Sequence, residues 1–522
     1  MPHGGADRLL SPDQIDFAKL DAALRSGGEG EEGERLALTN DLLGPKRFGR
    51  IFPDLPPFRP ADDGLTALGL AMQEAAPGSN SNIPAGFTYF GQFVDHDLTR
   101  DPSVGFPVIN NPDQLEDART PAFDLDSVYG MGPELQPELY DPGFPAKRAR
   151  FKLGHTGAAG APDASGNTIP GNLPNDLPRG SDRTAFVGDS RNDENLVIAQ
   201  THIAFLKFHN KVIGTLHDDD DAFRKARRLV KLHYHAILLD DHLARLLDPG
   251  VLADVRQHGP KFVHFKPHRA FMPIEFSAAA YRMGHSMVRA GYNYNRVFHF
   301  DPNFPRITGA TLGLLFQFTG AGGLSPNPAN PNPELPSNWV IDWRLWHEVD
   351  DAAHRSPHLN VTQAIDTKIT APLFNLPKPG VVADDPVQLA VRNLLRGSRL
   401  GLPRGQDVAK AMGVTPLTPD EVAGGTGGDV LRQFGFDKET PLWFYILREA
   451  ELAGANHLGQ VGSRIVAETF VALLRAGRES ILHDDDDFEP TLPRRDPGKF
   501  TFADLLLFVN DINPIGPDPT GF

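Results

Sequence analysis

The 522-residue sequence contains no cysteine. This absence excludes disulfides, zinc sites with thiolate ligands, iron–sulfur clusters, thiolate-ligated haem and covalent c-type haem attachment. Any metal chemistry must therefore use histidine, aspartate, glutamate and backbone oxygen atoms. The absence of disulfides also removes one indication of the compartment in which the protein works.

Long apolar runs and an excess of basic residues are absent as well. No stretch approaches the roughly 18 consecutive apolar residues of a membrane-spanning helix, so no such helix is expected. The formal net charge of −16 argues against nucleic acid or an anionic membrane as a partner, because both require a basic surface. The first residues, from Met1 to Gly5, lack the basic and apolar regions of a secretory signal.

Glycine and proline are abundant, at 51 and 47 residues, and they predict long loops. Between the loops, apolar residues recur about every 3.6 positions, which indicates helices. The predicted helical segments are 191–216, 222–247, 276–290, 386–397, 441–452 and 462–476. We expect a mainly α fold with little β structure, in which one large helical domain with extensive loops (46–510) follows a partly flexible N-terminal extension (1–45) and precedes a C-terminal tail (511–522).

The run Gly91-Gln92-Phe93-Val94-Asp95-His96-Asp97 is the first candidate site. On a helix, Gln92, Asp95 and His96 share a face while Asp97 points elsewhere. A solvated helix end is the alternative interpretation of an isolated Asp-His-Asp run. The aromatic residues around it indicate burial instead, and buried charges need a partner or a metal.

A second candidate is the run Thr120-Pro121-Ala122-Phe123-Asp124-Leu125-Asp126. Its oxygen donors at alternate positions suit a hard cation such as calcium, which takes six to eight oxygen ligands. These donors are Thr120, the Ala122 carbonyl, Asp124 and Asp126. The spacing is not that of an EF-hand, and an ordinary acidic turn is the alternative.

Three further pairs of polar residues stand one helical turn apart, and each alone could be a surface ion pair or a helix cap. They are Arg191 with Glu194, Arg282 with His285, and Asn393 with Arg396. Together with the first run, these segments (188–194, 282–285 and 393–396) resemble the haem-contacting motifs of the animal-type haem peroxidases. This is the peroxidase–cyclooxygenase superfamily of myeloperoxidase, lactoperoxidase and peroxidasin. The motifs occur in the family's order, and the chain looks closest to its bacterial-type, stand-alone members.

The resemblance implies a haem b cofactor and gives its neighbours roles. His96 would be the distal histidine and Arg191 the distal arginine, with Gln92 beside them in the catalytic group. His285 would be the proximal ligand of the haem iron, and its other ring nitrogen would donate a hydrogen bond to Asn393. His202 and His209 lie on a helix near Arg191 in sequence and are interpreted as ordinary core or surface histidines.

The resemblance also implies the contacts that would anchor the haem. Arg282 and Arg396 would pair with the haem propionates. Asp95 and Glu194 occupy the positions at which the family forms ester bonds to haem methyl groups. Myeloperoxidase has a methionine directly after its ester-forming glutamate, and here Asn195 occupies that position, so at most two covalent links are expected.

A calcium site follows from the same resemblance, with ligands at Asp97, Thr120, Ala122, Asp124 and Asp126. Because Asp97 directly follows His96, calcium would fix the backbone that orients the catalytic imidazole. Calcium and peroxide chemistry favour a location outside the cytoplasm, although no signal segment is visible.

The function implied is that of an oxidoreductase that reduces hydrogen peroxide through a ferryl intermediate and oxidises halides, pseudohalides or small phenolic donors, as in a response to oxidative stress. One alternative is a fatty-acid dioxygenase of the same superfamily. Those enzymes carry a radical-forming tyrosine three residues before the proximal histidine, where this chain has Arg282, with Tyr281 one position further back. Another alternative is a haem- and calcium-binding protein with vestigial activity.

Overall fold

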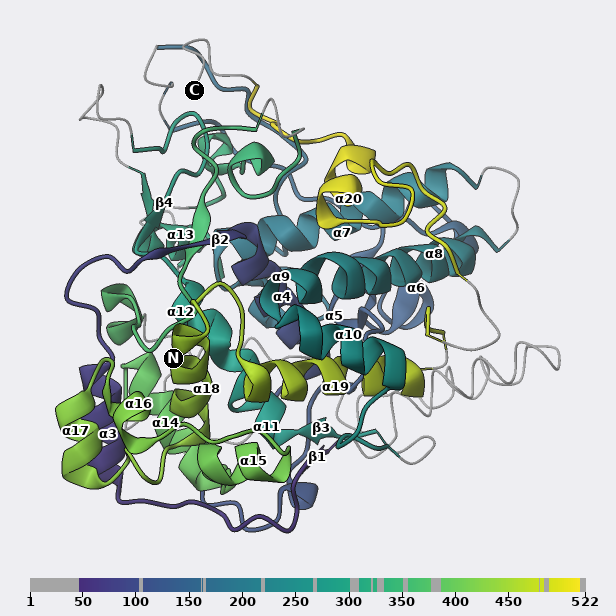
Figure 1. The fold of residues 1–522 in the computed structure, drawn as a ribbon. Helices are drawn as coiled ribbons and strands as arrows, with labels where there is room; N and C mark the ends of the chain where they lie inside the picture. Colours follow the sequence, from purple (N-terminus) through teal and green to yellow (C-terminus); the bar gives the residue numbers. More distant parts are fainter. Residues whose placement is uncertain are drawn as a thin grey trace, which may run out of the picture.

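The structure is a computed structural model, and it describes residues 47–102, 107–160, 162, 166–216, 221–265, 270–300, 309–320, 323–325, 333–350, 355–376, 386–477, 479–482 and 488–516. The expected N-terminal extension (1–45) lies outside this part of the chain. The described part is mainly helical with short strands, which confirms the predicted fold class (Figure 1).

Helix α4 (Gly86–Leu98) lies inside the fold and packs against α7 (Leu196–Gly214). Aromatic side chains form much of this interface: the rings of Phe93 and Phe205 stack at 4.7 Å. Around this pair lie longer helices that include α8 (Ala222–Ile237), α10 (Pro249–His258), α19 (Gln460–Ala476) and α20 (Phe502–Val509). α8 and α20 contact α7, and α10 packs on α19, as Figure 1 shows.

A second group of helices lies at the lower left of Figure 1, where α3 packs against α14 and α17 although they are far apart in sequence. The members of this group are α3 (Asp62–Ala71), α14 (Leu389–Leu400), α15 (Gly405–Ala411), α16 (Pro419–Ala423), α17 (Gly428–Phe434) and α18 (Leu442–Leu452). Contacts of α18 with α19 join this group to the rest of the fold.

The remaining α-helices among the described residues are short: α5 (Asp126–Tyr129), α6 (Gly132–Leu135), α9 (Leu243–Leu246), α11 (Ile274–Ser277), α12 (Gly284–Met287) and α13 (Leu312–Gln317). The strands form two-stranded sheets in which β1 (Phe48–Gly49) pairs with β3 (Met272–Pro273), β2 (Asn80–Pro84) with β6 (Val361–Gln363), and β4 (Gly291–Tyr292) with β5 (Ala310–Thr311). The first pair is parallel and the other two are antiparallel.

Most predicted helical segments match observed helices. The predicted segment 222–247 is α8 followed by a π-helical turn (Leu238–His242) and α9. The prediction for 276–290 is wrong as one helix, because the backbone at Ala279 (φ −134°, ψ −78°) leaves the helical region. The segment consists instead of the end of α11, a 3₁₀ turn (Ala280–Met283) and α12, and this break sets the position of Arg282 and His285.

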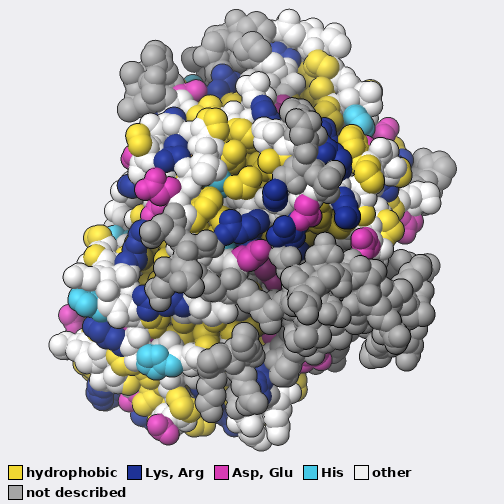
Figure 2. Space-filling view, turned by 90° about the vertical axis from the view of Figure 1, so that its right-hand side faces the viewer, with side chains coloured by type: hydrophobic (Ala, Val, Ile, Leu, Met, Phe, Trp, Pro, Cys, Tyr) yellow, Lys and Arg dark blue, Asp and Glu magenta, His cyan; other side chains and the backbone are white. Residues whose placement is uncertain are grey.

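One hydrophobic cluster extends from Phe48 to Leu506 and includes residues of both helix groups. The first part of the expected C-terminal tail also packs on the body: Asp511 is ion-paired with Lys207, and Ile515 is buried. Within the described part of the chain, none of the helices is both long and apolar enough to cross a membrane. On the face in Figure 2, basic and acidic side chains lie among one another.

Candidate active site

Helix α4 presents the first motif as the sequence predicted. Gln92 and Asp95 are half-buried on one face, and His96 beside them is only 4% exposed. Asp97 is completely buried and contacts a different part of the chain. The helix therefore separates two candidate sites, one on the face of His96 and one around Asp97.

The imidazole of His96 is buried and held by an asparagine. Its Nδ1 donates to Oδ1 of Asn192 at 2.9 Å. Burial, and then the positive charge of Arg191, lower the pKa of His96 to about 3. The ring is therefore neutral at ordinary pH and its Nε2 carries a lone pair, as a proton acceptor requires.

Arg191 lies beside His96 in a short 3₁₀ turn (Ser190–Asp193) that precedes α7. Its guanidinium donates to both carboxylate oxygens of Asp189, at 3.0 and 2.8 Å, and to the backbone oxygen of His96 at 3.2 Å. Asp189 is fully buried, and its contacts with Arg191 help to keep its pKa below the usual range although burial opposes this. The two expected catalytic side chains are thus brought together, with the cation held in a fixed position.

Gln92 connects this helix face with Glu194, at the end of the segment 188–194. Its amide donates to Oε2 of Glu194 at 3.0 Å and accepts from Asn195 at 3.1 Å. Asn195 also caps α7, because its Oδ1 accepts the backbone N–H of Ile198. The asparagine at the position of myeloperoxidase's methionine therefore has a structural role of its own.

The predicted proximal residues meet on α12 and α14, and α12 packs against α4. Nδ1 of His285 lies 2.7 Å from Nδ2 of Asn393, and Oδ1 of Asn393 accepts from Arg282 at 2.7 Å. The expected pair is present, but the expected direction is reversed, since here Asn393 donates and His285 accepts. The cause is Arg282, a pure donor that claims the amide oxygen.

The two remaining haem-anchoring candidates lie in different surroundings. Burial raises the pKa of Asp95, while the charges of Arg191 and Arg282 oppose the rise. This carboxyl therefore lies near cations of two motifs, the segments 188–194 and 282–285. Arg396 is ion-paired with Asp101. Its expected propionate contact therefore requires Arg396 to exchange or share this partner.

The second motif forms an acidic cluster around Asp97. Carboxylate oxygens of Asp97, Asp124 and Asp126 lie within 4.8 Å of one another. The hydroxyl of Thr120 is bonded to Asp126 at 3.4 Å, and Ala122 follows it in the same turn. Burial and repulsion from the neighbouring carboxylates raise the pKa of Asp97, and burial together with Asp126 raises that of Asp124 to about 7. Such crowding of buried oxygens is what a hard divalent cation would relieve.

Arg119 connects this acidic cluster with the distal arginine. It is ion-paired with Asp126, and its Nε lies 3.6 Å from Asp189, the carboxylate that holds Arg191. Negative and positive side chains therefore alternate from Asp126 through Arg119 and Asp189 to Arg191, which lies beside His96. Arg119 also occupies one carboxylate that a cation would use.

Replacing Arg119 with methionine is expected to destabilise the metal-free protein by about 3 kcal/mol or more, because buried carboxylates lose their partner. Calcium binding should become tighter, since the competing cation is gone. Chemical denaturation with and without calcium, and calorimetric titration, measure both effects. As a control, Arg224→Met removes an ion pair that is half exposed and should cost less than about 1 kcal/mol. Equal stability of the Arg119 variant and the parent would contradict the assignment.

A sequence profile of the family described as animal haem peroxidase matches residues 101–423, more than half of the chain. The chain belongs to the animal haem peroxidase family. The matched span includes Arg191, His285 and Asn393 and begins just after His96. Membership implies haem as the cofactor.

Individual members of the family are more distant. Thyroid peroxidase of Rattus norvegicus is 25% identical over 325 residues, which are 59% of this chain and 32% of that protein. Chorion peroxidase of Drosophila melanogaster is 24% identical over 345 residues, 62% of this chain and 38% of that protein. The chain thus spans well under half the length of these relatives.

Solved structures of the superfamily share the fold. Peroxidase A from Dictyostelium discoideum superposes with a TM-score of 0.57 at 17% identity, covering 91% of this chain and 95% of that chain. Fatty acid alpha-dioxygenase of Arabidopsis thaliana gives a TM-score of 0.53 at 16% identity, covering 88% and 75%. The fold is therefore common to peroxidases and dioxygenases, and the choice between them depends on the site.

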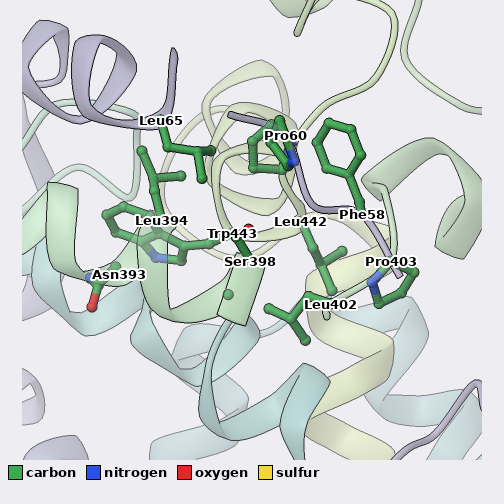
Figure 3. A pocket seen from close by; sticks show the side chains of 12 residues that line it. Phe58, Pro60, Leu65, Asn393, Leu394, Ser398, Leu402, Pro403, Leu442 and Trp443 are labelled. Atoms are coloured by element: carbon green, nitrogen blue, oxygen red, sulfur yellow. The ribbon is translucent and has the colours of Figure 1, made fainter. Parts of the chain in front are cut away.

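A small pocket lies near the proximal residues (Figure 3). Its lining is mainly apolar, with Phe58, Leu65 and Leu442 among the side chains and Asn393 at one edge. Trp443, also in the lining, donates from its indole to the carbonyl of Arg282 at 3.3 Å. The pocket therefore lies next to Asn393 and Arg282, two of the residues around His285.

Sequence reasoning missed several residues that hold the site together. Asn192, Asp189 and Arg119 all contact predicted site residues, and none was assigned a role. Asn192 and Asp189 lie inside the segment 188–194, on either side of Arg191, so their place within that motif was the available signal. For Arg119 the signal was a basic residue directly before a run of oxygen donors.

Proposed function

We propose that this chain is a haem peroxidase that reduces hydrogen peroxide and oxidises halides, pseudohalides or small phenolic donors. The observation that carries the proposal is the arrangement of His96 and Arg191. A neutral histidine and a fixed cation are joined through the Arg191–His96 backbone bond of 3.2 Å. Peroxide cleavage needs such a proton acceptor next to a positive charge.

The residues present fit a haem. His285 is half-buried rather than enclosed, and it lies on α12 next to α4, so it could reach an iron beside that helix. Arg282 and Arg396 would bind the anionic propionates, and Asp95 and Glu194 would flank the ring as the ester-forming carboxylates. Haem, when bound, would supply the iron at which the O–O bond breaks and the oxidising equivalents that the donors consume.

The peroxide step follows from the protonation states of the distal side chains. The Nε2 lone pair of His96 would take the proton from one oxygen of hydrogen peroxide and return it to the other, which leaves as water. Arg191 stabilises the negative charge that develops on the leaving oxygen. Because Asp189 already holds the guanidinium, little reorganisation is needed at that moment.

On the proximal side, iron ligation by Nε2 of His285 requires the ring proton on Nδ1. Asn393 would then have to present its oxygen rather than its amide nitrogen to the ring. That rotation would become favourable if Arg282 left the amide oxygen for a propionate.

An absorbance experiment on the purified, haem-loaded protein tests the proposal directly. We expect a Soret band, its rapid change on mixing with hydrogen peroxide, and its recovery when iodide, thiocyanate or a phenol is added. A protein that binds haem but does not respond to peroxide would contradict the proposal, and a missing Soret band would indicate a vestigial site.

Covalent attachment provides a separate prediction. After peroxide turnover, at most two ester links, through Asp95 and Glu194, should hold the haem, because Asn195 has no sulfur to form a third. Denaturing extraction and intact-mass analysis measure this. The double variant Asp95→Asn, Glu194→Gln should release all of its haem under conditions in which the parent retains it. A sulfonium-type link would refute the prediction.

The alternative is a fatty-acid dioxygenase, since such enzymes share the fold. Support for the peroxidase comes from Tyr281, whose hydroxyl is hydrogen-bonded to Nε2 of His242 at 2.8 Å and whose ring stacks on Phe276. This tyrosine is 7% exposed, and it is bound within the core. Oxygen uptake with a long-chain fatty acid in the absence of a phenolic donor would favour the dioxygenase.

We further propose that residues 46–510, together with the packed residues up to 516, form the catalytic domain. The proposed calcium site favours work outside the cytoplasm, where calcium is abundant enough to fill sites of modest affinity. Fractionation of the producing cells, followed by detection of the protein and of peroxidase activity, tests this location.

A further inference from the structure

One asparagine amide joins two buried histidines. Nδ1 of His96 lies 2.9 Å from Oδ1 of Asn192, and Nδ2 of Asn192 lies 3.0 Å from Nδ1 of His202. The three side chains are 4%, 0% and 1% exposed. They come from α4, from the 3₁₀ turn 190–193 and from α7, so the packing of three elements brings them together.

The polarity of the amide fixes the proton on each ring. A carbonyl oxygen can only accept, so Nδ1 of His96 must carry a proton. An amide N–H can only donate, so Nδ1 of His202 must be the unprotonated nitrogen. Neutral His96 therefore has its lone pair on Nε2, the nitrogen that the proposed peroxide step uses.

The surroundings of both partners hold this amide in place. The backbone N–H of Asn192 donates to the Asp189 carbonyl at 3.0 Å. The ring of His202 packs edge-on against Phe93, with ring centres 6.3 Å apart. Asn192 is thus tied to the residue that holds Arg191, and His202 to the aromatic interface of α4 and α7.

We propose that Asn192 is a positioning residue for His96, and that His202, by accepting from the amide nitrogen, favours the orientation in which the amide oxygen faces His96. With the amide reversed, Nδ1 of His96 would have to accept, its proton would move to Nε2, and the ring could not take a proton from peroxide. This inference rests on the proposed peroxidase function. It replaces the sequence-based interpretation of His202 as an ordinary core or surface histidine.

The experiment compares stopped-flow rate constants of the haem-loaded parent and its variants. Asn192→Leu keeps the volume but removes the acceptor, and it should lower the second-order rate constant for hydrogen peroxide about tenfold to a hundredfold. The rate constant for donor oxidation should fall much less, because that step does not require His96 to remove a proton from peroxide. A merely structural role of Asn192 would lower both constants by a similar factor or leave both unchanged.

His202 supplies a second, independent set of variants. His202→Leu removes the acceptor that orients the amide and should slow the peroxide step severalfold. His202→Asn can present an oxygen in the place of Nδ1 and should restore most of the rate. In an Asn192→Asp background, where either oxygen can accept, His202→Leu should have little further effect, so the two changes should not be additive.

His209 offers a matched control on the same helix. It is buried and bonded to Tyr129 and to the Ala149 carbonyl, with no connection to His96. His209→Leu can reduce stability but should leave the peroxide rate constant unchanged. If it slows the peroxide step as much as His202→Leu does, the proposal is wrong.

A spectroscopic measurement tests the proposal without turnover. In the diamagnetic carbon-monoxide complex of ¹⁵N-histidine-labelled protein, His96 should be protonated on Nδ1 in the parent and lose this preference in Asn192→Leu. Protonation on Nε2 in the parent, or equal peroxide rate constants for Asn192→Leu and the parent, would overturn the inference. A parent that does not react with peroxide but shows the expected tautomer would contradict the proposed function alone.

Discussion

Replacing His96 with alanine is expected to lower the rate constant for hydrogen peroxide by about three orders of magnitude, within the range that general acid–base catalysis supplies. The neutral imidazole belongs to the residue whose backbone oxygen binds Arg191, and its loss leaves the cation without a base beside it. Stopped-flow mixing of the haem-loaded variant with peroxide measures the effect.

Haem and calcium should remain bound in this variant, because the proposed ligands are other residues. The Soret band of the resting protein and the calcium content report this. His233→Ala is a suitable control, since His233 is equally buried, on α8, and contacts Leu229 and Phe500 rather than the site. A His96→Ala protein that reacts within about threefold of the parent would rule out this residue as the base.

Exhaustive removal of calcium is expected to lower both the peroxide reaction rate and the thermal stability. Without a cation, the carboxylates of Asp97, Asp124 and Asp126 repel one another at close range in a buried site. Asp97 is the residue after His96, so its displacement moves the catalytic ring. Calcium at a hundred times its dissociation constant would stabilise the fold by about 2.7 kcal/mol.

Melting curves and stopped-flow rates before chelation, after chelation and after calcium is restored measure this effect. Asp124→Asn should melt at a temperature that no longer depends on calcium. Asp366→Asn changes a buried carboxylate outside this cluster and should retain the dependence. Full turnover and an unchanged haem spectrum after chelation would show that the cluster does not support His96.

Much of the site could be predicted from the sequence because its information is local. The spacing within 91–97 places Gln92, Asp95 and His96 on one helix face and Asp97 on another, since a helix turns about 100° per residue. Alternate oxygen donors in 120–126 indicated a cation loop, and the structure places carboxylate oxygens of Asp124 and Asp126 within 4.8 Å of one of Asp97. Helical periodicity over long segments predicted α7, α8, α14, α18 and α19 within a few residues.

The tertiary structure decided what depends on contacts between distant segments. Arg282 takes the oxygen of Asn393 and thereby reverses the bond to His285, and Arg119 connects the acidic cluster to Asp189. The spacing of apolar residues did not predict the break at Ala279, because apolar residues continue through this segment although the backbone leaves the helical conformation.

His96 shows what was determined by the sequence and what was determined by the tertiary structure. Its identity as a candidate base came from the sequence: a histidine between aspartates, in a motif that recurs with the others in the order of a known family. Which of its nitrogens holds the proton came only from the fold, because Asn192 and His202 lie on other elements. Residue types and their spacing determine which groups are available, whereas the direction of each hydrogen bond depends on how those elements pack.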